Sequence, residues 1–256
     1  MIKIFRQIRQ TLVISGNSVK YLKYAIGEII LVVIGILIAL QINTWNENRK
    51  DRISEAIYYC KFLEDVDQDQ AILLTQIQKA KTRLHHANKL LHNLQNSDTQ
   101  MNELIFDMTG SVSSIDSKMQ VTTTAFEDLK SSGSLVIIKD PKIKKKLTDY
   151  YSTAQGILTV VNDNNTAIGN RFKNNDDRIN AGWVYLIEKQ NGFDTTLINI
   201  NDLKSKVFMN ESLKTKLMND ALSYLGTSSR NIEHFENLQK EIEIIKATLE
   251  KKCQRK

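Results

Sequence analysis

One long apolar run stands out in the pattern of hydrophobic and polar positions along the chain. Between Tyr24 and Ile42 the sequence reads YAIGEIILVVIGILIALQI, in which only Glu28 and Gln41 are strongly polar. These 19 residues would form a helix of about 28 Å, close to the thickness of a bilayer's hydrocarbon core. The aromatic residues Tyr21 and Trp45 stand near its ends, and no small-residue cleavage site follows. The pattern predicts a retained transmembrane helix over residues 24–42.

Basic residues on the two sides of this run predict its orientation. The run is preceded by no acidic residue and by five basic ones: Lys3, Arg6, Arg9, Lys20 and Lys23. Four more follow within residues 49–61, so the excess is modest. By the positive-inside rule, residues 1–23 lie in the cytoplasm and residues 43–256 lie outside it. Residues 2–13 have an amphipathic helical pattern, so this basic tail either lies on an anionic leaflet or only sets the orientation.

Beyond the apolar run, the hydrophobic positions recur with a heptad period. The polar segment after Trp45 contains no Pro or Gly, so we expect the anchor to continue directly into a long helix that ends at Asn96–Asp98. Two heptad positions are apolar in nine of ten residues, which is typical of a helical bundle or coiled coil. These residues are Leu63, Gln70, Ile77, Leu84 and Leu91 at one position, and Val66, Leu73, Ala80, Ala87 and Leu94 at the other.

The middle of the chain predicts shorter helices joined by polar connections. A short helix over residues 101–108 is followed by a loop rich in small polar residues, and then by a capped helix that ends at Leu129. Asp140 and Pro141 offer an N-cap acceptor followed by a proline at the first helical position, so they predict the start of another helix.

The last third of the chain predicts one more long helix. The helix that begins at Pro141 should reach Val160 and then fray, or become a loop, in the Asn-rich residues 162–180. Residues 182–199 carry aromatic rings that need burial, which favours a folded connection over a flexible linker. An apolar helical stripe follows Asn210, with Gly226 expected to kink or divide the helix.

The composition supports an all-α fold. The 256 residues include one Pro, ten Gly and 7% aromatic residues, too few for the turn-rich strands of a sandwich or barrel. A net charge of +6 would suit a nucleic-acid partner, but the apolar run argues against one. We therefore expect a single transmembrane helix that continues into a long-helix, coiled-coil-like extracytoplasmic bundle, with no nucleic acid bound.

Polar and small residues within the anchor are candidates for docking another helix. A carboxylate such as Glu28 is costly in hydrocarbon, so it either lies at the headgroup boundary or binds a partner. Gly27, Gly35 and Ala39 lie at spacings of four and eight residues, and small residues at such spacing let a second helix approach closely. The expected partners are the lipid bilayer and either a membrane protein or a second copy of the chain.

The charged and histidine-rich segments do not match the motifs of metal sites or catalytic sites. Asp65, Asp67 and Asp69 lack the Gly and Glu of a calcium loop and are interpreted as a solvated acidic face. His85, His86 and His92 lack the spacing and additional ligands of a metal site, so a structural or surface role is expected. The chain has no nucleophile elbow, phosphate loop or dinucleotide motif. The sequence therefore predicts no catalytic residue, metal or cofactor.

The two cysteines fall near the start and the end of the outer domain. In an up-and-down bundle with an even number of long helices, Cys60 and Cys253 would return to the same end and could form a disulfide in an oxidising compartment. Two free thiols are equally consistent with the sequence.

Two stretches carry a resemblance to a known family. The pattern FRQIRQ followed by KYLKYAIGEIILVVIGILIALQINTWNENRK resembles the leader of a large uncharacterised family of membrane proteins from Bacteroidota, over residues 1–52. TAFEDLKSSGSLVIIKDPKIKKKLTDYY, residues 124–151, resembles the same family. The resemblance implies a single-pass protein of the bacterial inner membrane with a helical extracytoplasmic domain, and it supplies no catalytic residues.

Three functions fit these observations. The first is a membrane-anchored interaction or sensing module; about 23 cytoplasmic residues are too few for an output domain, so a signal would pass through a partner or through oligomerisation. The second is a structural envelope scaffold or accessory subunit with no ligand. The third, a soluble nucleic-acid-binding protein, requires the apolar run to be a core helix.

Overall fold

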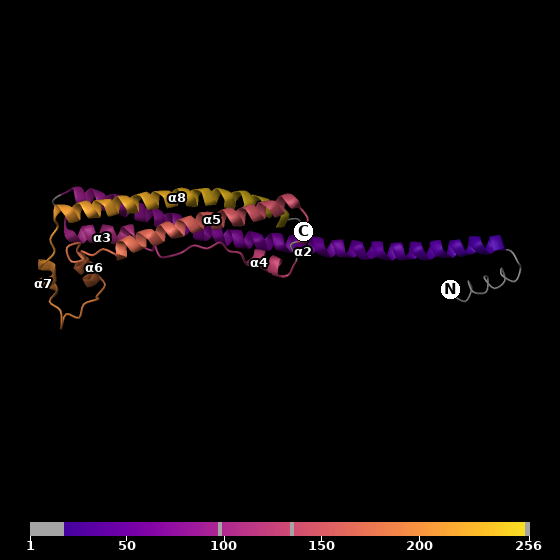
Figure 1. The fold of residues 1–256 in the computed structure, drawn as a ribbon, viewed down its shortest axis with the longest axis horizontal. Coiled ribbons are helices and arrows are strands. Elements are labelled where there is room, and N and C mark those ends of the chain that lie inside the picture. The colour runs from indigo at the N-terminus through magenta and orange to yellow at the C-terminus, as the bar shows by residue number, and fades with distance from the viewer. Residues whose placement is uncertain (1–17, 97–98, 134–135, 254–256) are drawn as a thin grey trace. The chain divides into compact units, whose positions relative to one another are not determined.

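The computed structural model describes residues 18–96, 99–133 and 136–253, and within them the chain is helical without any strand (Figure 1). This confirms the all-α prediction. The helices are α2 (Ser18–Gln95), α3 (Met101–Ser111), α4 (Thr124–Ser131), α5 (Pro141–Lys173), α6 (Trp183–Lys189), α7 (Ile200–Ser205) and α8 (Glu211–Cys253). The chain divides into two compact units, Met1–Glu55 and Ala56–Lys256, called unit 1 and unit 2 below.

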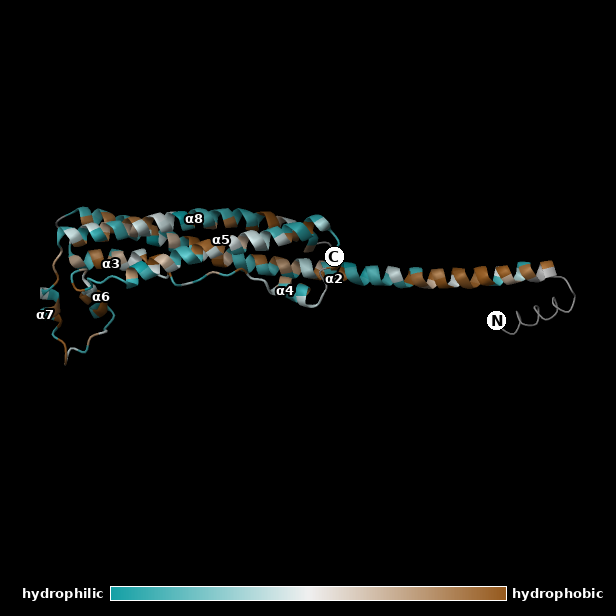
Figure 2. Cartoon of the chain, viewed as in Figure 1, coloured by the Kyte–Doolittle hydropathy of each residue, from teal (hydrophilic) through white to brown (hydrophobic). Residues whose placement is uncertain are grey.

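The described part of unit 1 is the apolar first part of α2. By length and composition α2 can cross a membrane, and none of its most apolar window is buried (Figure 2). A Cβ atom added at Gly27 or Gly35 would meet no other atom within 4 Å. Glu28 is half-buried and Ala39 is exposed. Residues 1–17, which include most of the predicted basic tail, lie outside the described residues.

Unit 2 is a bundle with an up-down-up-down course. Figure 1 shows the second part of α2 beside α5 and α8, with α2 and α5 running in one direction and α8 in the other. The second arm returns as α3, an irregular segment over residues 112–123, and α4. One end of the bundle holds the Cys60–Cys253 pair and the ion pair between Asp140 and Lys252. At the other end α2 finishes, and Arg171 of α5 pairs with Asp220 of α8.

Two hydrophobic clusters fill the bundle, with polar side chains between them. Phe62, Leu158 and Ile242 belong to the cluster near the cysteines, whereas Leu90 and Leu217 belong to the other. Polar groups buried in a core need hydrogen-bond partners, so the side chains of the intervening layer depend on hydrogen bonds to one another and to the backbone.

This polar layer contains one residue from each long helix. Asn231 of α8 donates from Nδ2 to Oδ1 of Asn165 on α5, at 2.8 Å. Arg83 of α2 is 1% exposed, and its Nη1 donates to the Ser113 carbonyl at 3.3 Å. Burial lowers the pKa of the Arg83 guanidinium.

Several predicted helix boundaries are confirmed. The long helix continues through residues 43–58 and ends at Gln95. The Asp140 carboxylate accepts hydrogen bonds from the backbone N–H groups of Lys142 and Ile143, which caps α5. The side chain of Asn210 caps α8 in the same way. Trp183 of the predicted folded connection stacks on Phe172, with 5.1 Å between ring centroids.

One of the two predicted heptad positions on α2 is displaced by one residue. Val66, Leu73, Ala80, Ala87 and Leu94 are buried as predicted. At the other predicted position Ile77 is buried, whereas the remaining four residues are half-buried. The five residues one position earlier are all buried: Phe62, Asp69, Gln76, Arg83 and Leu90. Three of these five are polar, so a pattern that counts only apolar residues cannot locate them.

The interpretation of Asp65 and Asp69 as a solvated acidic face is wrong. These side chains are 6% and 1% exposed, whereas Asp67 is exposed and pairs with Lys246. Asp69 accepts the N–H of Thr122 in the irregular segment, and Asp65 accepts the N–H of Ala125 in the first turn of α4. Their burial is stabilised by these bonds, because a carboxylate away from water needs hydrogen-bond donors.

Two predictions about α5 and α8 are also wrong, the first of them in part. Residues 162–173 of the Asn-rich stretch stay helical, because asparagines there have partners: Asn162 donates to the Met119 carbonyl, and Asn165 accepts from Asn231. Residues 174–180 lie outside the helix, as predicted. Gly226 does not divide α8, which is continuous from Glu211 to Cys253. Packing of buried faces along both helices outweighs the low helix propensity of Asn and Gly.

Candidate binding site

A cleft of about 1500 Å³ opens at the end of unit 2 opposite the cysteine pair. Its walls come from the last turns of the α2 helix, from α3 and from α6, with Lys204 of α7 at one side. The lining mixes rings with charged groups, chiefly His86, Lys89, Phe106, Tyr185 and Lys189.

His86 is held in the cleft wall by a buried carboxylate. Its Nδ1 lies 2.9 Å from Oδ1 of Asp107, a residue that is 3% exposed. Oδ2 of Asp107 accepts a hydrogen bond of 2.9 Å from the Asn93 amide. An ionised carboxylate only accepts hydrogen bonds, so this geometry assigns the proton to Nδ1 of His86. Nε2 has no protein partner among the described residues and is the ring nitrogen left for a ligand.

Helix α3 positions this imidazole through three residues that lie on one of its faces. A Cβ atom at Gly110 would lie 2.4 Å from Cγ of His86, so the ring packs directly on backbone that has no side chain. The Phe106 ring meets His86 edge-on, with 5.2 Å between centroids. Gly110 follows Phe106 by four residues and Asp107 by three, so both side chains lie on the side of α3 where Gly110 is.

Cations surround the rings on the α6 side of the cleft. Nζ of Lys189 lies 4.8 Å from the centroid of the Phe106 ring, which is half exposed. Lys204 makes a 2.8 Å ion pair with Glu188 and lies over the Tyr185 ring. In the described part of the chain, neither Lys89 nor Lys189 has an ion pair. Of the carboxylates in the lining, the exposed Glu103 alone has no ionic partner among the described residues.

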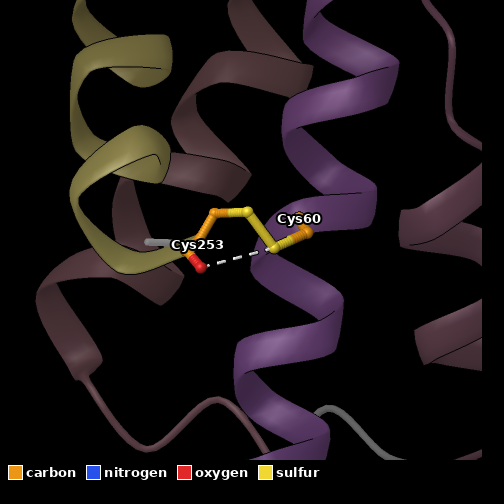
Figure 3. The surroundings of a disulfide bond; sticks show 2 residues. All are labelled: Cys60 and Cys253. Carbon is orange, nitrogen blue, oxygen red and sulfur yellow. Dashed lines mark hydrogen bonds between the residues drawn. A yellow bond between two sulfur atoms is a disulfide. The ribbon is translucent and has the colours of Figure 1, made fainter. Parts of the chain in front are cut away.

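The cysteine pair lies at the other end of unit 2. The structure joins Cys60 of α2 to Cys253 of α8 by a disulfide, with Cα atoms 4.9 Å apart (Figure 3). Two ion pairs lie at this end of the bundle, Lys61 with Asp128 at 3.0 Å and Lys252 with Asp140 at 3.5 Å. The disulfide thus joins the end of α8 to the first turns of α2 that belong to unit 2.

The predicted docking residues of the anchor form a separate group on α2 in unit 1. Gly27, Glu28, Gly35 and Ala39 all lie within the apolar segment, and Ala39 borders a shallow hollow that also includes Trp45. The cleft and the disulfide belong wholly to unit 2, so these three sets of residues are not one site.

Among the histidines that the sequence singled out, His86 alone has a buried carboxylate partner. His85 is exposed, and His92 contacts Asn96 of its own helix. The described residues contain no group of three His, Cys, Asp or Glu side chains that could hold a metal ion.

Sequence reasoning missed the other residues of the cleft: Phe106, Asp107, Gly110 and Lys189. One signal was present, because Asp107 interrupts the apolar run LIFDM in a short helix, and an acidic residue there needs a buried partner. The approach of Lys189 depends on the tertiary fold, since it lies 83 residues away from Phe106.

Residues 28–155 match the family described as "Family of unknown function (DUF6090)". The matched range extends from the anchor to the first half of α5 and includes His86, Asp107 and Gly110, whereas Tyr185 and Lys189 lie beyond it. No curated protein and no solved structure matches the chain.

Proposed function

We propose that this chain, which belongs to the DUF6090 family of unknown function, is a membrane-anchored interaction or sensing module that binds a ligand or partner without catalysing a reaction. The cleft at His86 carries the proposal. Its imidazole is oriented by a buried carboxylate and by a glycine contact, yet Nε2 is left without a protein partner. In ligand-binding clefts a small number of fixed polar groups of this kind orient the ligand.

The proposed location is the inner membrane of a bacterium of the Bacteroidota, with a single pass through residues 24–42. The exposed apolar part of α2 and the basic residues before it support a cytoplasmic N-terminus and an extracytoplasmic bundle. In this orientation the cleft and the cysteine pair both lie outside the cytoplasm. The resemblance of the anchor pattern to an uncharacterised family of Bacteroidota membrane proteins supports the same location.

The anchor provides the proposed route to other membrane proteins. Gly27 and Gly35 leave the surface of α2 open, because no other described segment comes within 4 Å of a Cβ added at either glycine. Together with Ala39 and Glu28 they form the surface that we propose for self-association or for docking a partner helix. A partner bound here would carry the signal, since the predicted cytoplasmic tail is short.

Affinity purification tests the proposal. The tagged full-length protein is extracted from native membranes in mild detergent, and co-purifying proteins are identified by mass spectrometry. Phe106→Ala alters the cleft and Gly35→Leu alters the anchor, while Ile244→Ala and Ile34→Leu are matched controls at an exposed position of α8 and a neighbouring position of the anchor.

The outcomes distinguish interaction from scaffolding. A specific partner that is lost from Phe106→Ala or Gly35→Leu but kept by the controls supports an interaction module and identifies the surface it uses. If the same set of proteins follows all four variants, the proposal fails. The alternative is then a structural scaffold or accessory subunit, a role that suits a bundle whose first and last helices are tied by a disulfide.

A further inference from the structure

We infer that the cleft binds a small organic anion, with a carboxylate attached to a flat apolar group. This inference deepens the proposed function by naming the chemical class of the ligand. It depends on three features of the cleft wall: cations without acidic partners, an exposed aromatic ring beside one of them, and the oriented imidazole of His86.

The charges of the lining favour an anion once the existing pairs are set aside. Asp107 is engaged by His86 and Asn93, and Glu188 is engaged by Lys204. Among the lining side chains without an ion pair in the described part of the chain, two are cationic, Lys89 and Lys189, and one is anionic, the exposed Glu103. A ligand carboxylate between these lysines would make charge-assisted hydrogen bonds, which are stronger than neutral ones.

The apolar part of the ligand is set by Phe106. Its side chain is 50% exposed even though it lies in a helix with five buried residues, so part of the ring surface is open to the cleft. Lys189 Nζ lies over this ring at 4.8 Å, which places a positive charge beside an apolar surface. A ligand that joins an anionic group to a planar body complements both at once.

His86 adds directional recognition. Asp107 and Gly110 fix the ring plane, so Nε2 has a defined direction before any ligand arrives. An imidazole can accept a hydrogen bond at Nε2 when it is neutral, and it donates one to an anion when it is protonated. Preorganisation of this kind reduces the entropic cost of binding.

Benzoate is the probe, because it combines a carboxylate with one aromatic ring, and benzamide is its neutral counterpart of the same shape. Binding is measured by ligand-observed NMR titration of the full-length protein in detergent micelles. For nine heavy atoms we expect a benzoate Kd of about 1–10 mM and binding of benzamide at least about fivefold weaker.

Lys189→Gln removes the cation over Phe106 at an exposed position, so it keeps the fold while it weakens benzoate binding by at least about fivefold. Lys145→Gln, at an exposed position of α5 away from the cleft, leaves the Kd unchanged. His86→Gln weakens binding as well, and the helical circular dichroism signal verifies that each variant is folded.

Equal affinity for benzoate and benzamide, equal affinity in Lys189→Gln and Lys145→Gln, or no benzoate binding overturns the inference. Its failure differs from failure of the proposed function. If benzoate does not bind but a protein partner is lost from Phe106→Ala, the cleft binds another class of ligand. If neither binds, both proposals fail.

Discussion

At the scale of single residues, the position of the His86 ring depends on the absence of a Cβ atom at Gly110. The His86 ring occupies the space that any Cβ at this position would need, with ring atoms 2.4–2.7 Å away. This packing restricts where the imidazole ring can lie, and the hydrogen bond with Asp107 sets the direction of Nδ1. The glycine is thus part of the site although it makes no polar contact itself.

Gly110→Ala is expected to lower the free energy of unfolding by about 1–3 kcal/mol, because the new methyl group overlaps the ring and displaces it from Asp107. Urea unfolding of the full-length protein, followed by circular dichroism, measures the change.

Gly156→Ala is the matched control for this substitution. Gly156 also lies inside a helix, but an added Cβ meets nothing within 4 Å. The control is expected to raise the free energy of unfolding by up to about 1 kcal/mol, through helix propensity alone. If both glycines respond with the same sign, the close contact at His86 is wrong.

Buried Asp65 predicts a pH dependence with a definite sign. Burial raises its pKa above the ordinary value of 3.8, although the N–H of Ala125 donates to the carboxylate and opposes the rise. The folded protein therefore holds this proton at pH values where the unfolded chain has lost it. The contribution of Asp65 to stability decreases as pH rises from 3.8 through the raised folded value.

Asp65→Asn removes this titration while an amide oxygen can still accept from Ala125. We expect the stability of the variant relative to the parent to increase as the pH rises above 3.8. Asp128→Asn is the control of opposite sign, because a hydrogen bond from Lys61 lowers the pKa of that exposed carboxyl. The stability of this variant relative to the parent is expected to increase as the pH falls below 3.8 and to stay level above it. Urea titrations at several pH values measure both, and equal slopes for the two variants would contradict the assignment.

At the scale of helices, the returning arm explains why Asp69 and Arg83 of α2 are buried. Residues 112–123 between α3 and α4 are irregular, so their backbone groups lack the pairing that a helix provides. Side chains of the neighbouring long helices pair with them instead. Asp69 accepts from Thr122 N–H, Arg83 donates to the Ser113 carbonyl, and Asn162 donates to the Met119 carbonyl.

This arrangement also shows what could be predicted from the sequence. Helix starts such as Asp140-Pro141 depend on neighbouring residues, and they were predicted correctly. Asp69 and Arg83 are buried because of an arm more than 25 residues away in the chain, and a hydropathy pattern assigns such residues to the surface. The cleft was missed for the same reason, since it forms only when α3 and α6 pack against α2.

Tyr150 and Tyr151 offer a paired test of the contact between α5 and α2. Both side chains are buried, but Tyr150 donates a 2.6 Å hydrogen bond to Asp69, whereas the Tyr151 hydroxyl has no hydrogen-bond partner within the part of the chain that the structure describes. Tyr150→Phe is expected to lower the free energy of unfolding by about 1–3 kcal/mol, because it leaves a buried carboxylate oxygen unpaired.

Tyr151→Phe is the neighbouring control and removes a hydroxyl that gains nothing from the fold. Its effect should lie within about 0.5 kcal/mol of the parent or be stabilising. Chemical denaturation of both variants under the same conditions provides the comparison. A larger loss in Tyr151→Phe than in Tyr150→Phe would show that Asp69 is not paired as described.

At the scale of the whole molecule, the disulfide ties together residues 193 positions apart and thereby encloses most of unit 2. A crosslink over so long a span restricts the unfolded chain strongly, since the closed loop contains nearly all of the bundle. The bond also bears on location, because disulfides persist outside the cytoplasm and are reduced within it. One measurement of the thiols in cells therefore tests both the pairing and the proposed orientation.

Replacing both cysteines, Cys60→Ser with Cys253→Ser, is expected to lower the free energy of unfolding by about 2–5 kcal/mol, with the helix content unchanged. Reduction of the parent protein should have the same effect, whereas the double variant should not respond to reductant. In cells, thiols are alkylated during acid quenching, and the parent is then compared with the double variant on a non-reducing gel. Two alkylated cysteines in the parent would contradict both the bond and an extracytoplasmic bundle, because an oxidising compartment would have joined thiols held this close.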